Sequence, residues 1–245
     1  MMAGQVDTVS PPDIAPDRKP TEGTRGRFIT FEGGEGSGKS TQVANLATRL
    51  RALGLDVVVS REPGGSVGAE AIRHVLLSGA AKPLGPHAEA ILFAAARADH
   101  MRETIAPALA RGAWVISDRF ADSTRIYQGV LGNVDRRLIA RLEKVTIGDL
   151  KPDLTIILDV PATQGQERVS KRRGTAAADR FEAEAFDFHK KLREAYLELA
   201  EHEPDRCVPV DASGDAQSVA NAVWAVVNAH LHPGEAPAML KDAAS

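Results

Sequence analysis

Apolar residues recur along the chain in two spacings, one typical of strands and one typical of helices. Short runs of apolar and β-branched residues predict five buried strands, at 27–32, 55–60, 112–119, 153–160 and 207–213. Between the first two runs, apolar residues trace one face of a helix that Gly54 is placed to end: Val43, Leu46, Ala47, Leu50 and Leu53. We predict further helices over 67–77, 86–105, 123–148 and 219–230, and on both sides of the basic run at 171–173.

The alternation of strands and helices predicts an α/β fold, with a five-stranded parallel sheet covered by helices on both faces. Pro107 is expected to kink or restart the helix that begins near Pro86. The chain shows no internal repeat and no long linker, so we expect one domain over 26–232. Residues 1–25, with prolines and scattered charges, are expected to be a disordered tail, and residues 233–245 a flexible one.

Composition narrows the class of protein. Apolar residues make up 43% of the chain and charged residues 26%, and the net charge of −3 gives no reason to expect a nucleic-acid or membrane partner. Cys207 is the single cysteine, which excludes a disulfide within the chain and favours a reducing compartment. No apolar run approaches the roughly 20 residues of a membrane span, and the first residues lack a signal-peptide core. We therefore expect a cytoplasmic protein.

Residues 33–41 carry the first clear chemical motif. Gly33 followed by Gly38, Lys39 and Ser40 matches the phosphate-binding pattern G-x-x-x-x-G-K-[ST], between a predicted strand and a predicted helix. Glycines admit positive φ and let backbone N–H groups approach phosphate oxygens at a helix N-terminus. We expect Lys39 to face solvent and the β- and γ-phosphates, and Ser40 to bind Mg²⁺. The expected ATP-binding residues are Gly33, Gly34, Glu35, Gly36, Ser37, Gly38, Lys39, Ser40 and Thr41.

Two further pairs suggest an acceptor site. Phe93 and Arg97 lie four residues apart on one helical face, where a ring and a planar cation suit a pyrimidine base. The alternative is a core phenylalanine beside a surface arginine. Asp118 and Arg119 end the third strand, at the sheet edge where such folds bind ligands. Asp118 suits an outer position around Mg²⁺ and Arg119 suits a phosphate, although a structural salt bridge is also open.

The ordered set of segments resembles bacterial thymidylate kinase. The segments are FEGGEGSGKST at 31–41, REPGG at 61–65, FAAAR at 93–97, SDRF and ADSTRIYQG at 117–129, and DRFEAE at 179–184. The resemblance runs from about Arg27 to His230, and REPGG and the SDRF–YQG block are its specific parts. It implies a P-loop nucleoside-monophosphate-kinase fold with a lid segment, transfer of phosphate from ATP to dTMP with Mg²⁺, and a homodimer.

The resemblance also implies roles for single residues in the acceptor site. Phe93 would stack on thymine and Arg97 would read its edge, while Gln128 and Thr124 could contact the imide. Tyr127 would exclude a 2′-hydroxyl, with plain packing as the alternative. Glu35 would accept from the 3′-hydroxyl, and Arg73 and Arg119 would bind the acceptor phosphate. Glu62 and Pro63 are also expected to be substrate-binding residues.

The catalytic charge is expected to come partly from a lid. The variable positions of the phosphate loop, 34–37, hold no basic residue, and transfer between two anions needs more positive charge than Lys39 and Mg²⁺ supply. The run Lys171, Arg172 and Arg173 before Gly174 resembles the lid of bacterial relatives, and we favour Arg173 over Arg172. A solvated helix end is the alternative. The expected catalytic residues are Lys39, Arg119, Arg172 and Arg173.

Other readings of the phosphate loop are less consistent with the sequence. A deoxynucleoside kinase shares the loop but has no clear use for REPGG. A GTP-dependent switch could use the D-x-x-G at 211–214, yet the chain has no N-K-x-D motif for guanine. The seven histidines show no metal-ligand spacing. A nucleoside monophosphate kinase is therefore the main hypothesis.

Overall fold

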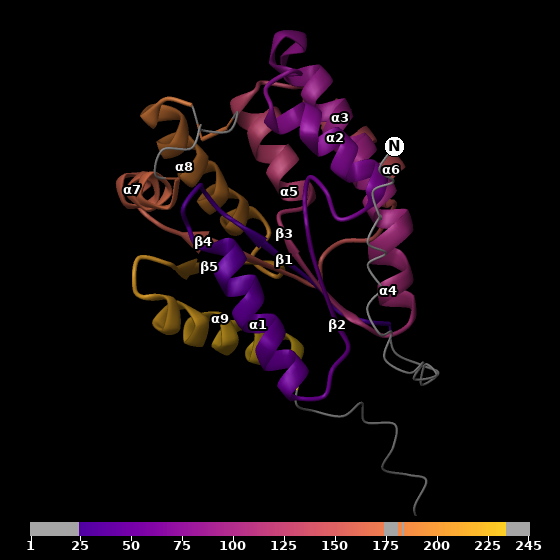
Figure 1. Ribbon diagram of the computed structural model, residues 1–245, viewed down its shortest axis with the longest axis vertical. Coiled ribbons are helices and arrows are strands. Elements are labelled where there is room, and N and C mark those ends of the chain that lie inside the picture. Colours follow the sequence, from indigo (N-terminus) through magenta and orange to yellow (C-terminus); the bar gives the residue numbers. More distant parts are fainter. Residues whose placement is uncertain (1–24, 174–180, 183, 234–245) are drawn as a thin grey trace, which may run out of the picture.

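A five-stranded, all-parallel sheet forms the centre of the molecule, as the alternation of elements predicted (Figure 1). The computed structural model describes residues 25–173, 181–182 and 184–233. The strand order is β2-β3-β1-β4-β5. The strands are β1 (Phe28–Glu32), β2 (Val57–Arg61), β3 (Trp114–Asp118), β4 (Leu154–Asp159) and β5 (Cys207–Asp211). The predicted tails lie almost entirely outside the described residues, so the proposed domain limits stay a prediction.

Helices cover both faces of the sheet (Figure 1). They are α1 (Lys39–Ala52), α2 (Val67–Leu77), α3 (Gly85–His100), α4 (Ala106–Ala110), α5 (Ala121–Thr124), α6 (Arg136–Ile147), α7 (Ala162–Arg173), α8 (Phe186–His202) and α9 (Ala216–Leu231). On one face, α1 and α9 pack with alternate strand residues into one core. On the other, α4 packs against Phe28 and Val115 of the sheet, and α8 packs against Ile157. The expected three-layer arrangement is confirmed.

Two long helices of the sequence prediction differ in detail. The stretch expected at 123–148 is not continuous: α5 passes into a π-helical segment, Arg125–Leu131, and α6 begins only at Arg136. Asn133 has φ 52° and Asp135 caps α6 by accepting from the Arg137 N–H, so the chain turns between the two helices. After α3, a π-helical turn, Met101–Ile105, leads into α4, and Pro107 lies in the first turn of α4.

The carboxyl ends of the central strands bring the sequence motifs together. In the parallel register Phe31 of β1 lies opposite Asp118 of β3, and the Arg119 N–H donates to the Phe31 carbonyl at 2.9 Å. Because all strands run the same way, the loops that follow β1, β2 and β3 leave the sheet at one edge. Within the described ranges, no helix combines the length and the apolar character that a membrane crossing requires.

Candidate active site

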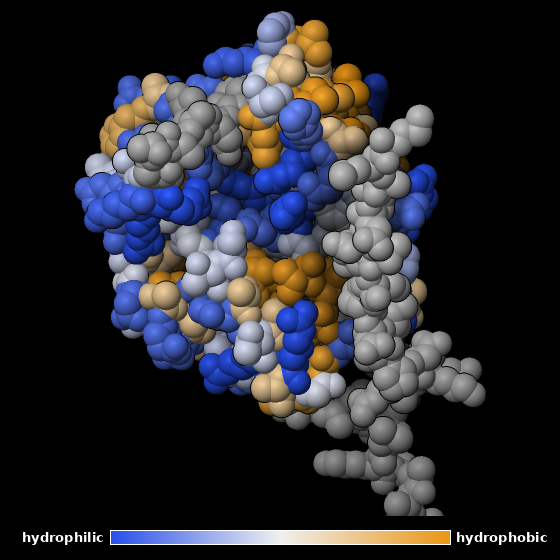
Figure 2. All heavy atoms as spheres, in the orientation of Figure 1, coloured by the Kyte–Doolittle hydropathy of each residue, from blue (hydrophilic) through white to orange (hydrophobic). Residues whose placement is uncertain are grey.

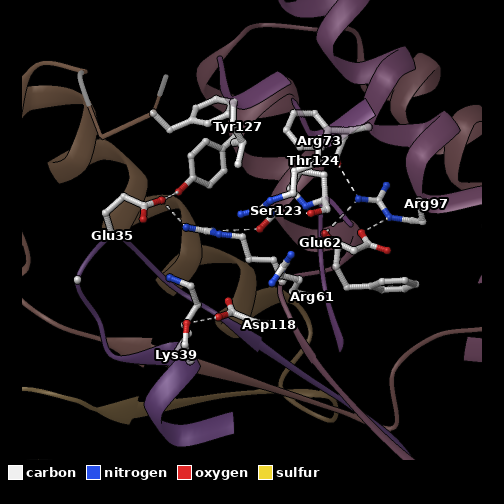
Figure 3. Close-up of a pocket in the computed structure, with 18 of the residues that line it drawn as sticks. Glu35, Lys39, Arg61, Glu62, Arg73, Arg97, Asp118, Ser123, Thr124 and Tyr127 are labelled. Carbon is white, nitrogen blue, oxygen red and sulfur yellow. Dashed lines mark hydrogen bonds and ion pairs between the residues drawn. The ribbon is translucent and has the colours of Figure 1, made fainter. Parts of the chain in front are cut away.

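A cleft of about 460 Å³ opens at this edge of the sheet. Figure 2 shows hydrophilic residues gathered in a hollow in the middle of one face, and Figure 3 shows the residues that line it. The walls come from the phosphate loop, the loops after β2 and β3, helices α2 and α3, and the end of α7. Most sequence-predicted site residues line this one cleft: Glu35, Gly36, Gly38, Lys39, Ser40, Thr41, Glu62, Pro63, Arg73, Phe93, Arg97, Asp118, Arg119, Thr124, Tyr127, Gln128 and Arg172.

The phosphate loop has the backbone shape that the glycines predicted. Gly33, Gly36 and Gly38 have φ of 131°, 73° and 92°, values that favour glycine. Gly38 directly precedes α1, whose first turn contains no acidic residue, so the free backbone N–H groups at this helix start favour an anion. A loop of this shape binds the phosphates of a nucleotide.

Lys39 does not extend into solvent as expected. Only 7% of the residue is exposed, and its ammonium lies 2.9 Å from the Gly34 carbonyl, 3.2 Å from the Gly33 carbonyl and 3.5 Å from Ser37 Oγ. The expectation was wrong because the loop folds over the lysine stem and turns its carbonyls toward the charge. Burial lowers the pKa of Lys39, while the carboxylates of Glu35 and Asp118 oppose this shift. Lys39 therefore fixes the loop as well as facing the cleft.

Ser40 and Asp118 form the oxygen-rich corner of the cleft. The Ser40 hydroxyl donates to Asp118 Oδ2 at 2.6 Å, which joins the start of α1 to the end of β3. A hydroxyl and a carboxylate are ligands that suit Mg²⁺, which keeps several waters and takes other ligands from substrate phosphates. In the described part of the chain, no cluster of three or more His, Cys, Asp or Glu could hold a metal by itself. The pair fits a metal held mainly by nucleotide phosphates.

Arg119 lines the cleft, and its backbone lies in the left-handed region with φ 73°. Its Nη2 donates to Glu35 Oε1, and its Nη1 donates to Ser123 Oγ at 3.1 Å and to Tyr196 OH at 3.2 Å. Tyr127 also donates to Glu35 Oε1, at 3.1 Å. Burial alone would raise the pKa of Glu35, but the charges of Arg119 and Lys39 outweigh it and lower the pKa to about 2. The site therefore holds an ionised carboxylate beside two cations.

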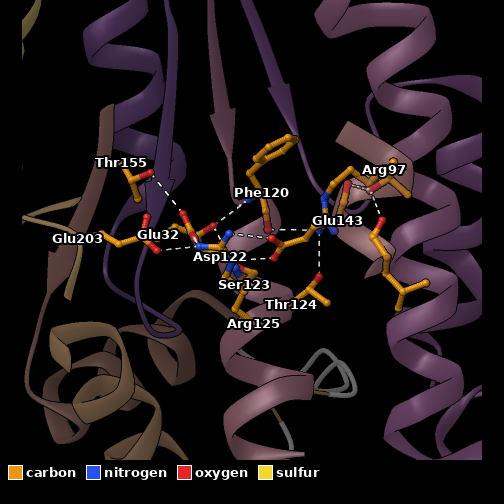
Figure 4. A network of polar contacts seen from close by, with 12 residues as sticks. Glu32, Arg97, Phe120, Asp122, Ser123, Thr124, Arg125, Glu143, Thr155 and Glu203 are labelled. Carbon is orange, nitrogen blue, oxygen red and sulfur yellow. Dashed lines mark hydrogen bonds and ion pairs between the residues drawn. The ribbon is translucent and has the colours of Figure 1, made fainter. Parts of the chain in front are cut away.

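A buried glutamate that the sequence analysis did not single out, Glu32, forms polar contacts with Phe120 and Ser123 (Figure 4). Glu32, at the end of β1, is fully buried and accepts from Ser123 Oγ at 2.6 Å, Tyr196 OH at 2.7 Å and the Phe120 N–H at 2.8 Å. Burial and the nearby Asp122 carboxylate raise the pKa of Glu32. Because both hydroxyls donate to Glu32, their lone pairs face Arg119. The sequence did carry a sign of this role: Glu32 is an acidic residue at the end of a strand made mostly of apolar residues.

The far end of the cleft has the composition of a base pocket. Phe93 is half-buried, with its ring centroid 6.1 Å from that of Phe181. Arg97 is only 2% exposed, which rules out the surface arginine that was the alternative. Gln128 is equally buried and donates to Glu89 Oε2 at 3.4 Å. A ring, a cation and an amide thus line one buried recess.

The loop after β2 closes the side of this recess. The Pro63 carbonyl accepts from Arg73 Nη1 at 2.6 Å, which ties the REPGG segment to α2. Glu62 is 6% exposed and pairs with Arg97 at 2.8 Å. Glu62, Arg73 and Arg97 all line the cleft, and Glu62 also holds Arg97 in place.

The expected lid begins at α7. Arg172 is largely exposed, lines the cleft and donates to Glu182 Oε1 at 2.6 Å. The Arg173 side chain and residues 174–180, including Arg180, lie outside the described residues, so the choice of lid arginine stays open. Near its start, α7 touches the phosphate loop: a Cβ on Gly36 would lie 2.1 Å from the Gly165 carbonyl oxygen, and a Cβ on Gly165 2.6 Å from that of Glu35.

Comparisons with known proteins identify the family of this chain. A family model described as thymidylate kinase matches residues 31–223. The thymidylate kinase of Nitrobacter winogradskyi is 61% identical over 204 residues, covering 83% of this chain and 89% of that protein; that of Bradyrhizobium diazoefficiens is 58% identical over 209 residues, covering 85% and 92%. The crystal structure of thymidylate kinase from Ehrlichia chaffeensis matches with a TM-score of 0.66 and 33% identity, covering 83% of this chain and 99% of that one. The chain therefore belongs to the thymidylate kinase family.

Proposed function

We propose that this protein transfers the γ-phosphoryl group of ATP to dTMP, giving dTDP for the synthesis of dTTP. The observation that carries the proposal is the single cleft, which joins a phosphate loop at one end to a buried recess of ring, cation and amide at the other. Two nucleotides bound from opposite ends would meet at Arg119 and Lys39. Membership of the thymidylate kinase family supports dTMP as the acceptor.

In this proposal the phosphate loop binds the donor. Residues 33–41 wrap the β- and γ-phosphates, Lys39 offers its ammonium to them, and Ser40 with Asp118 would hold Mg²⁺. Bound there, Mg²⁺ supplies charge that neutralises the phosphate oxygens during transfer. The protein's own contribution is to fix Lys39 and Arg119 before the substrates arrive, so that no reorganisation is needed during the reaction.

The acceptor nucleotide would lie along the other half of the cleft. Phe93 stacks on the base, Arg97, Thr124 and Gln128 contact its polar edge, and Tyr127 occupies the space near the sugar 2′ position. Glu35 is held between Arg119 and Tyr127, as an acceptor for the 3′-hydroxyl. Arg73 and Arg119 lie where the acceptor phosphate would enter.

A coupled assay with a panel of acceptors tests the function. ADP release from ATP and Mg²⁺ is followed with dTMP, dUMP, dCMP, dAMP, dGMP and the deoxynucleosides, with GTP as an alternative donor. We expect turnover with ATP and dTMP, and none with thymidine. Phosphorylation of thymidine in place of dTMP would support the deoxynucleoside kinase, and GTP hydrolysis without an acceptor would support the switch.

Arg97→Ala tests the base recess. Loss of one charged hydrogen bond to the base corresponds to about 1.5–3 kcal/mol, so the KM for dTMP should rise roughly 10- to 150-fold. The KM for ATP should stay unchanged, because Arg97 lies away from the phosphate loop. Steady-state kinetics with each substrate varied in turn measure both values. Unchanged dTMP kinetics would contradict the assigned base contact.

The lid arginines are tested by Arg172→Ala, Arg173→Ala and the double variant. A contact made only when the lid closes on the transferring phosphate acts in the transition state. We therefore expect the double variant to lose at least about 10²-fold in kcat, with little change in the KM for dTMP. Single-turnover measurements show whether the chemical step has slowed. Full kcat in the double variant would assign the charge to Arg119 or Arg180 instead.

We also propose a homodimer in the cytoplasm. Helix α3 packs against both α2 and α6, and the three helices expose Val67, Ile91 and Val145. Figure 2 shows hydrophobic residues at the upper right, over α2 and α3. The family resemblance implies a homodimer. The exposed apolar side chains also support one, because exposed apolar patches often mark protein interfaces.

A further inference from the structure

A chain of three hydrogen bonds runs behind the base recess. Ser60 Oγ lies 2.5 Å from His100 Nε2, His100 Nδ1 lies 3.0 Å from Glu62 Oε1, and Arg97 Nε donates to Glu62 Oε2 at 2.8 Å. Ser60 lies near the end of β2 and Glu62 directly follows the strand, while Arg97 and His100 lie three residues apart on α3, so the two pairs face each other. His100 is fully buried.

The carboxylate of Glu62 decides which nitrogen of His100 carries hydrogen. An ionised carboxylate accepts hydrogen bonds and cannot donate them, so His100 Nδ1 must carry a hydrogen and donate it to Glu62. In the neutral ring Nε2 is then the acceptor, and the Ser60 hydroxyl donates to it. With a neutral ring, the charges of Glu62 and Arg97 balance inside the protein, and both ring nitrogens are satisfied.

The backbone at Gly65 shields the outer bond of this chain. A Cβ on Gly65 would lie 2.3 Å from Ser60 Oγ and 2.4 Å from His100 Nε2, so the glycine backbone lies directly against both atoms. Thr104 holds this backbone in place by donating to the Gly65 carbonyl at 2.7 Å. Ser60, His100 and Glu62 are connected in the same order as the residues of a hydrolytic triad. Because the backbone of Gly65 covers the Ser60 hydroxyl, however, the three residues have a structural role.

The inner end of the chain aims Arg97. Its Nε is held by Glu62, and its Nη2 donates to Thr124 Oγ1 at 3.0 Å and to the Phe120 carbonyl at 3.3 Å. Nη1 forms no hydrogen bond with other residues of the described ranges, and Arg97 lines the cleft. The Glu62 carboxylate therefore fixes the Nε side of the guanidinium, while Thr124 and the Phe120 carbonyl hold Nη2, so that Nη1 is directed by these three contacts together.

We propose that His100, held by Ser60, positions Arg97 for the acceptor base by fixing the carboxylate of Glu62. Without the Nδ1 donor, Glu62 can turn about its last torsion, and Arg97 turns with it. His100 touches no substrate in this scheme and acts only through Glu62 and Arg97. The inference rests on the proposed function, because it takes Arg97 to contact the base of dTMP.

Two amide variants of His100 separate the two bonds. Asparagine places its amide nitrogen near Nδ1, so His100→Asn keeps the donor to Glu62 and loses the contact with Ser60. Glutamine reaches the Nε2 position, so His100→Gln keeps the contact with Ser60 and loses the donor to Glu62. Outer hydrogen-bond partners of metal-binding histidines are worth about 10- to 100-fold in affinity or activity, and we take the lower end of that range as the guide for His100. We expect His100→Gln to raise the KM for dTMP about tenfold at unchanged kcat and unchanged KM for ATP, and His100→Asn to stay within about threefold of the wild type.

The outcomes distinguish positioning from plain stability. An equal rise in the dTMP KM in both variants, or a parallel fall in kcat and melting temperature, would overturn the proposal. If the wild-type protein did not phosphorylate dTMP, the proposed function would be refuted. If the wild type turned over dTMP normally and His100→Gln left the KM for dTMP unaltered, only this inference would be refuted. If the variants do not fold, ¹⁵N NMR of histidine-labelled wild-type protein gives the answer. A hydrogen on His100 Nδ1 is expected, and its absence would overturn the proposal.

Discussion

Lys39→Ala is expected to lower kcat by at least about 10²–10³-fold, as loss of a single group that stabilises transition-state charge does elsewhere. The ammonium lies among the loop carbonyls of Gly33 and Gly34, at the start of α1, where the donor phosphates would bind. Its loss removes positive charge as negative charge shifts among the phosphate oxygens. It also frees two carbonyls that the lysine now holds, so a modest loosening of the loop is expected.

Lys39→Met serves as the matched control, because it keeps most of the aliphatic stem and removes only the charge. Steady-state kinetics with ATP and dTMP, together with thermal unfolding, should be measured for both variants. We expect both to be nearly inactive, with melting temperatures closer to the wild type for methionine than for alanine. An active Lys39→Met variant would show that packing of the stem, and not the ammonium, is what the reaction requires.

Arg119→Ala is expected to disable the enzyme and to destabilise it. The guanidinium is the main partner of Glu35 and lines the cleft in which the proposed function places both phosphates. Removing one member of a buried ion pair typically costs about 3–5 kcal/mol; because the side chain of Glu35 is 19% exposed, we expect roughly 2–3 kcal/mol here. kcat should fall by at least about 10²-fold, since a charge at the reacting phosphates is lost.

The pH dependence of unfolding identifies the cause. In the wild type the pKa of Glu35 is lowered to about 2, so its contribution to stability is fully present above its unfolded pKa of about 4.5. This contribution is lost as the pH falls from about 4.5 toward 2. Without Arg119 the pKa should rise, and this part of the acid destabilisation should disappear. Chemical unfolding at pH 7 and at several values between about pH 4.5 and 2 measures the difference between the two proteins.

A second substitution separates stability from activity. Arg119→Ala combined with Glu35→Gln removes both charges and leaves no buried carboxylate without its partner. We expect the double variant to regain most of the free energy of unfolding at pH 7 while remaining inactive. If the double variant is as unstable as Arg119→Ala, the contacts of Arg119 with Ser123 and Tyr196 carry its stability instead of the ion pair.

The sequence predicted those features that depend on local patterns. Strand runs, helix faces and the glycine spacing at 33–38 are set by residues close together in the chain, and the structure confirms the sheet they implied. Phe93 and Arg97 were found because residues four apart on a helix share a face. The site residues predicted from the chemistry of their side chains mostly line one cleft in the structure.

The features that the sequence did not predict depend on distant contacts. Tyr196 reaches Glu32 across 164 positions, and no local pattern shows that a tyrosine of α8 donates to a glutamate of β1. Lys39 was expected in solvent because motif spacing does not show how the loop folds over the side chain. The histidines showed no metal-ligand spacing, and no role was predicted for His100. Its partner Glu62 lies 38 positions away, in the REPGG segment, so no local pattern connects the two residues.

The close contact between Gly36 and Gly165 has a consequence for how these two positions tolerate change. Alanine at 165 would favour helix α7 by about 0.5–1 kcal/mol in isolation, yet its methyl group would meet the Glu35 carbonyl oxygen at 2.6 Å and push the loop away. Alanine at 36 would open the same gap from the other side. Once the gap is open, the second methyl group meets little further resistance, so the effects of the two substitutions on stability should be smaller together than their sum. In a double-mutant cycle, residues 129 positions apart should thus behave as one unit.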